Sequence, residues 1–144
     1  MKVYSSNLTE KVSVNINTST LAAMDLLVDN GYYSNRSDFI NQALREAIQR
    51  NEPNIQRCSE EAGRKLSCGE WFMGVRVLTL QEVEEYLVQG RSVSITGYGV
   101  LCVGNDIPAE KLFQAVSSIQ VRGKVAACQP ILEHYSKLSA LENR

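Results

Sequence analysis

The sequence predicts two folded parts, a strand followed by two helices at the N-terminus and a small α+β domain at the C-terminus. Three observations support this division. Polar and apolar residues alternate over residues 11–17, two stretches with helical spacing follow, and a new apolar region opens at Trp71 after a polar, charged stretch. We expect an N-terminal module over residues 1–51, a linker over 52–70 and a second domain over 71–144.

The alternation over residues 11–17 is typical of a half-buried strand. One face carries β-branched residues: Val12, Val14 and Ile16. The other face carries polar residues that include Lys11, Ser13 and Asn15. A single strand leaves its backbone groups without partners, and no strand with a matching pattern follows within forty residues. The simplest partner is the same strand of a second copy of the chain.

Two helices are predicted after this strand. The first begins near Asn17 or Thr18, and Gly31 suits the left-handed position that ends it. Its apolar residues recur at helical spacing: Leu21, Met24, Leu27 and Val28. The second begins at Asn35 with Asp38 three residues on, and it is expected to end near Pro53. Its apolar face is broad: Phe39, Ile40, Ala43, Leu44, Ala47 and Ile48.

A strand, a helix, a turn and a helix in about forty residues, with GYYSNRSDFINQALREAI as the second half, resemble the ribbon-helix-helix family of transcription regulators. The resemblance covers residues 10–50. It implies an intertwined homodimer whose paired strands enter the DNA major groove. By position, Lys11, Ser13 and Asn15 would read bases, and all three side chains suit hydrogen bonding to base edges. The backbone N–H groups of Asn35, Arg36 and Ser37 would bind a DNA phosphate.

Composition narrows the remaining function classes. Residues 1–51 hold five basic and five acidic residues, so this module is neutral where many DNA-binding proteins are basic. The single histidine, His134, has no neighbouring ligand, and the four cysteines form no C-x-x-C pair. Since nickel-responsive members of the same family carry a histidine-rich sensor domain, the sequence argues against metal sensing. We expect no cofactor, no metal, no catalytic residues and, in the absence of a signal peptide or long apolar run, a cytoplasmic protein.

The C-terminal domain is predicted to contain a helix over residues 79–87, with Thr79 and Glu82 as a capping box and Gly90 as the stop. Residues 93–96 and 100–103 are strand-like and are separated by a turn or bend at 97–99. A helix from Pro108 through about residue 117, a strand over 119–127 and a helix from Pro130 follow. The domain is therefore expected to be α+β.

A shift of 26 residues superposes Val93, Ile95, Gly97 and Cys102 on Ile119, Val121, Gly123 and Cys128. This pattern fits two strand-strand-helix repeats, or a chance similarity between two ordinary pieces. Repeated units bury their apolar faces against neighbours, and another chain can supply the missing neighbour. We therefore expect residues 71–141 to associate into oligomers larger than a dimer, or to sense an unknown protein or small molecule.

The leading interpretation is a homodimeric DNA-binding regulator, acting as a repressor on double-stranded DNA. Two alternatives stay open. An antitoxin would repress its own operon and hold a C-terminal segment against a toxin. An assembly or partition protein would use stacked repeats to build oligomers linked to DNA.

Overall fold

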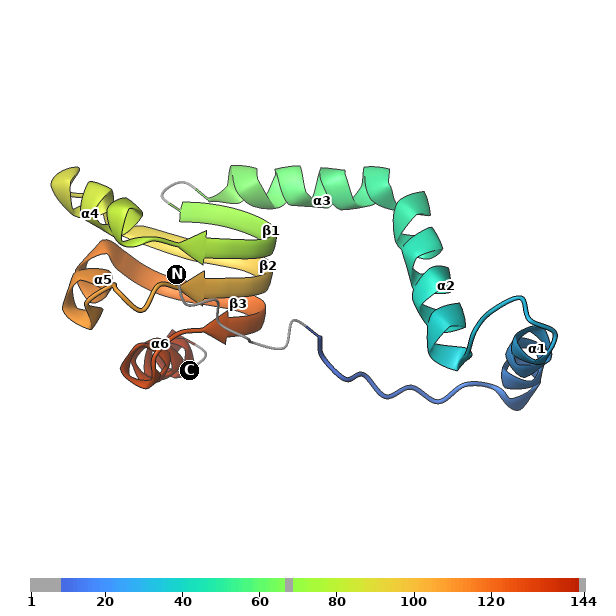
Figure 1. Cartoon of the computed structure of the whole chain (residues 1–144). Coiled ribbons are helices and arrows are strands. Elements are labelled where there is room, and N and C mark those ends of the chain that lie inside the picture. The colour runs from blue at the N-terminus through green and yellow to red at the C-terminus, as the bar shows by residue number, and fades with distance from the viewer. Residues whose placement is uncertain (1–8, 67–68, 143–144) are drawn as a thin grey trace. The chain divides into compact units, whose positions relative to one another are not determined.

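The computed structural model describes residues 9–66 and 69–142, and these residues fall into two compact units. One unit spans Thr9–Cys58, and the other begins at Ser59. Each unit is described by itself below. Figure 1 shows the order of the elements along the chain.

The first unit contains helix α1 (Thr18–Asp29), helix α2 (Arg36–Arg50) and the beginning of the helix that follows. Asn17 caps α1 by accepting a hydrogen bond from the Ser19 N–H at 2.9 Å. Gly31 follows the C-cap residue with φ of +80°. Its N–H bonds the Val28 carbonyl, and the N–H of Tyr32 bonds the Leu27 carbonyl, the pattern that closes a helix with a left-handed residue. The prediction that Gly31 ends this helix is confirmed.

The strand predicted at residues 11–17 is not formed in the single chain, which has no regular secondary structure there. The segment lacks a second strand to accept and donate its backbone hydrogen bonds, and a lone strand is not stable in water. Val12 and Val14 are 78% and 71% exposed, so the face predicted to be buried lies in solvent. Among the described residues, no strand pairs with this segment.

Residues predicted as a linker over 52–70 form helix α3 (Glu52–Lys65) and the start of the next strand. The Asn51 carbonyl accepts the first hydrogen bond of α3 from the Ile55 N–H at 3.0 Å. Pro53 lies in the first turn, where its missing N–H costs nothing. Glu52 at the start and basic Arg64 and Lys65 at the end match the helix dipole. These local signals account for a helix within the segment predicted as a linker.

The second unit alternates strands and helices, which corrects the α+β prediction to an α/β arrangement. The elements are β1 (Gly69–Leu78), α4 (Leu80–Val88), β2 (Val93–Val103), α5 (Ala109–Ala115), β3 (Val116–Ala126) and α6 (Gln129–Glu142). The strands are parallel in the order β1-β2-β3, so each helix is a crossover or follows the last strand (Figure 1). The capping box of Thr79 and Glu82 is confirmed at the start of α4.

The turn or bend predicted at residues 97–99 is wrong, because β2 continues without a break from Val93 to Val103. Gly74, Gly99 and Gly123 lie in one row across the three strands, all with positive φ. A Cβ on Gly99 would overlap the Gly74 carbonyl oxygen. Glycine here permits a backbone conformation inside a strand, and pairing with neighbours on both sides keeps the strand continuous.

The two strand-strand-helix repeats are likewise replaced by three strand-helix units. The register pairs Gly99 with Gly123 and Ile95 with Ile119, whereas the 26-residue shift superposes Gly97 on Gly123. The similarity found by that shift is therefore out of register with the sheet. It reflects the shared composition of consecutive parallel strands more than a structural repeat of two strands.

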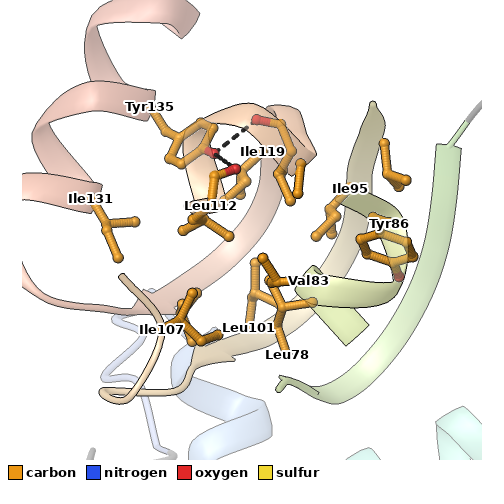
Figure 2. Close-up of a cluster of buried hydrophobic side chains, with 14 residues drawn as sticks. Leu78, Val83, Tyr86, Ile95, Leu101, Ile107, Leu112, Ile119, Ile131 and Tyr135 are labelled. Carbon is orange, nitrogen blue, oxygen red and sulfur yellow. Dashed lines mark hydrogen bonds between the residues drawn. The ribbon is translucent and has the colours of Figure 1, made fainter. Parts of the chain in front are cut away.

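Helices α4, α5 and α6 all contribute to a single core on one face of the sheet (Figure 2). Strand residues at alternate positions meet helix residues; the largest fully buried side chains are Leu78, Ile95, Leu101, Leu112, Ile131, Val83, Val93, Val103 and Val116. The buried Tyr135 hydroxyl lies 2.9 Å from the Val116 carbonyl oxygen and 3.3 Å from that of Leu112. Burial raises the pKa of Tyr135, so the hydroxyl remains a donor to α5 and β3.

Candidate nucleic-acid interface

The predicted base-reading residues lie on the segment that precedes α1. Lys11, Ser13 and Asn15 are all exposed, and they alternate with Val12 and Val14 along an extended chain. In one chain the three polar side chains do not share one face of a strand, because residues 11–17 form no strand. Their use as one recognition surface depends on the pairing of this segment with a second copy.

The start of α2 is fixed by a set of local hydrogen bonds. Asn35 is the N-cap residue in an extended conformation, and its side chain accepts from the Asp38 N–H at 2.8 Å. The Asp38 carboxylate in turn accepts from the Ser34 N–H at 3.0 Å. The two side chains hold the turn before α2 in a defined shape, as the sequence predicted for this Asn-Asp pair.

This geometry leaves donors available at the helix start. Within residues 9–66, no acceptor bonds the backbone N–H groups of Asn35, Arg36 or Ser37. The first N–H groups of a helix have no partner inside it, and the positive end of the helix dipole favours an anion there. A phosphate oxygen is a suitable acceptor for these groups. The carboxylate of Asp38 lies in the first turn of α2, and its negative charge would repel such a phosphate.

The Arg36 side chain is already engaged in the chain. Its Nε and Nη2 atoms each donate to one carboxylate oxygen of Asp25, both at 2.8 Å, and so join α2 to α1. The hydrogen bond from Arg36 lowers the pKa of Asp25, and the same contact raises the pKa of Arg36. Sequence reasoning did not single out Asp25, because the pairing depends on the angle between the two helices.

No residue of α2 is buried in the single chain. Ile40, Leu44 and Ile48 are all exposed, and they share one face because they recur every four residues. In α1 only Met24 is buried. Phe39 packs edge-on against Tyr33, with ring centroids 4.8 Å apart. The first unit therefore presents an apolar helix face and an apolar segment at 12–16 that one copy cannot bury alone.

Other kinds of site have little support among the described residues. No cluster of three or more histidine, cysteine or acidic side chains is placed to hold a metal ion within residues 9–66 and 69–142. His134 stacks on Phe113 at 3.8 Å between ring centroids, so it is a packing residue. Cys58, Cys102 and Cys128 are free thiols, and Cys68 lies outside the described residues. None of the helices that the structure describes is long and apolar enough to cross a membrane.

Comparison with known proteins identifies the family. No curated protein and no solved structure matches the chain. The model of the Ribbon-Helix-Helix transcriptional regulator family matches residues 7–132. This match extends well beyond the residues 10–50 that carry the resemblance in the sequence, and it takes in most of the second unit. The chain belongs to the ribbon-helix-helix transcriptional regulator family.

Proposed function

We propose that this regulator is a homodimeric, sequence-specific repressor that reads the DNA major groove with a two-stranded ribbon. Its family is a class of DNA-binding transcription regulators. The observation that supports the dimer most directly is that the apolar row of Val12, Val14 and Ile16 and the apolar face of α2 are both exposed in one chain. Pairing of two copies buries both surfaces and supplies the missing strand partner.

In the proposed dimer Lys11, Ser13 and Asn15 of each chain face the base edges. Lysine donates to guanine, asparagine bonds adenine with two groups, and serine serves either role. The free N–H groups at Asn35, Arg36 and Ser37 hold a phosphate and fix the register of the ribbon. Because the module has balanced charge, affinity depends on geometry more than on bulk electrostatics.

We propose residues 1–51 as the DNA-binding module, 52–70 as its connection and 71–144 as a domain that associates with its counterpart or senses an effector. The protein acts in the cytoplasm without catalysis in this proposal. The alternative of an antitoxin requires a C-terminal segment that folds against a toxin. The closed core of the second unit, with nine large side chains fully buried, favours a domain that folds within the chain.

Selection of bound sequences from random duplex DNA tests this proposal. The wild-type protein should enrich a motif with two related half-sites. Asn15→Ala should cost about 1 to 3 kcal/mol of binding free energy on that motif and relax the preference at one base pair per half-site, while non-specific binding stays the same. Asn41→Ala, on the exposed surface of α2, is the matched control and should select the wild-type motif. Absence of any motif, or an unchanged motif with Asn15→Ala, would contradict the proposal.

A further inference from the structure

The second unit has a sheet face that helices α4, α5 and α6 do not cover. Helices α4, α5 and α6 pack on one face, and the alternate strand residues point to the other, here called the open face. Its largest exposed side chains are Met73, Val75 and Val77 on β1 and Tyr98 on β2, which are 58%, 62%, 48% and 51% exposed. The strand register places Met73 beside Tyr98, Val75 beside Val100 and Val77 beside Cys102. These side chains therefore form one continuous apolar surface.

Such a surface is unusual for a parallel sheet, because parallel sheets are normally covered on both faces. Helix α3 reaches one end of it, where the Trp71 Nε1–H donates to the Ser59 Oγ at 2.8 Å. The half-exposed Val75 and Val77 lie beyond this contact along β1. An apolar patch of adjoining large side chains on a folded domain marks an interaction surface.

The open face is apolar on two strands and polar on the third. Gln120, Arg122 and Lys124 of β3 lie beside Thr96, Tyr98 and Val100 of β2. Arg122 and Lys124 are exposed, so the apolar surface of β1 and β2 has a basic border on one side only. A partner that fits this surface must be apolar over β1 and β2 and must keep clear of the positive charges.

We infer that the open face packs against the open face of a second copy of this chain. Two copies related by a two-fold axis that runs parallel to the strands, between β1 and β2, place β1 of one copy over β2 of the other. The stacked sheets are then about 10 Å apart. This arrangement puts the apolar strands together and carries Arg122 and Lys124 of each copy to opposite outer borders, where they do not face each other.

The open face is too small to hold two independent proteins together, which favours a second copy that is already held nearby. Two strands of about ten residues present roughly 300 Å² in plan, from strand spacing and rise per residue. Stable interfaces between independent proteins bury about 800 Å² per partner. The inference rests on the proposed dimer, because the N-terminal modules of two chains would hold two open faces at a high effective concentration.

Aromatic and basic residues on a sheet are also typical of surfaces that bind single-stranded nucleic acid. Here Trp71 and Tyr98 pack edge-on, with ring centroids 5.5 Å apart, and the Trp71 ring nitrogen is bonded to Ser59. The two rings therefore contact each other and do not form a row of separate parallel platforms along the strand. The aliphatic side chains of Met73, Val75 and Val77 also add no stacking surface, so a protein partner fits better.

Substitution of Val75 in the full-length protein tests the inference. Val75→Glu places a charge at the centre of the open face, and Val88→Glu is the matched control, since Val88 is 88% exposed on α4 and outside that face. Sedimentation velocity over a dilution series should show self-association weakened at least tenfold by Val75→Glu and unchanged by Val88→Glu. Circular dichroism should show wild-type helix content for both variants.

A second measurement tests contact directly. With the four native cysteines replaced by serine, Val75→Cys should be joined to its counterpart by a bis-maleimide reagent that spans about 10 Å, and Val88→Cys should not. Equal assembly and equal cross-linking at the two positions would overturn the inference. So would loss of single-stranded DNA binding by Val75→Glu with assembly unchanged. Equal results at the two positions in a protein that is still dimeric and selects a duplex motif would show that only this inference has failed, whereas a monomer that selects no motif would show failure of the proposed function.

Discussion

Asp25 of α1 and Arg36 of α2 form a bidentate ion pair, with both N···O distances at 2.8 Å, beside the helix start where the phosphate is expected. Arg36 therefore carries its counter-ion within the chain. The pair is largely exposed to solvent, so its role in folding is small. Its main consequence is electrostatic, because Asp25 neutralises the one basic side chain at the start of α2.

Replacing Asp25 by Asn should therefore strengthen DNA binding. The change frees the Arg36 guanidinium for a phosphate, so the plot of log binding constant against log salt concentration should steepen by roughly 0.9 for each added contact. Fluorescence anisotropy with a labelled duplex at several salt concentrations measures this slope. Asp29→Asn removes the same charge from α1 at a residue that is not the ion-pair partner of Arg36, and it should leave the slope almost unchanged. Equal slopes for the two variants would mean that the ion pair does not restrain Arg36.

Val14→Asp should abolish the N-terminal module as a folded unit. Val14 is exposed in one chain and lies at the centre of the row that the proposed dimer buries. A charge there prevents association, and folding of the segment and association are one event. Helix content by circular dichroism should fall, and duplex binding should be lost. A monomeric Val14→Asp protein that kept normal helix content would exclude an obligate dimer.

Glu82 should make the stability of the second unit sensitive to acid. Burial raises its pKa, but hydrogen bonds from Arg76 and Thr79 outweigh burial, so the pKa lies below its ordinary value of 4.5. The stabilisation is present above pH 4.5 and is lost as the pH falls through the lowered pKa of the folded state.

Glu82→Gln should remove that part of the pH dependence. Urea unfolding followed by fluorescence of Trp71, the single tryptophan, should give lower stability than wild type near pH 6 and a smaller fall below pH 4.5. Glu85→Gln is the control on the same helix, where the neighbour of the carboxylate is the neutral Gln81. If wild type and Glu82→Gln lost stability in parallel on acidification, the Arg76 and Thr79 contacts would not stabilise the ionised carboxylate.

Gly99→Ala should destabilise the second unit strongly. Gly99 has φ of +124°, and a Cβ there meets the Gly74 carbonyl inside the sheet, so the expected loss is about 2 kcal/mol or more. Gly63→Ala in α3 meets nothing within 4 Å, and it should instead add up to about 1 kcal/mol through higher helix propensity. Thermal unfolding of both variants gives the comparison. A Gly99→Ala protein as stable as wild type would show that the glycine row can relax without cost.

Local signals in the sequence determined the starts of α1, α2 and α4, the end of α1 and the family of the N-terminal module. Asn17, Gly31, Asn35 and the Thr79–Glu82 pair act within one turn of the residues that they cap, so neighbouring residues alone specify them. The resemblance over residues 10–50 also identified the family that the match over 7–132 shows.

Tertiary structure decided the features that depend on distant partners. Residues 97–99 look like a turn by themselves, yet β1 and β3 pair with both sides of β2 and hold it extended. The pairing of Asp25 with Arg36 depends on how α1 and α2 cross. The row at Val12 and Val14 is exposed in one chain, where no strand among the described residues pairs with it. The spacing of residues along the chain predicts apolar faces and helix caps. The pairing of strands and helices depends on contacts between residues that are distant in sequence, so it is decided only in the folded chain or between two chains.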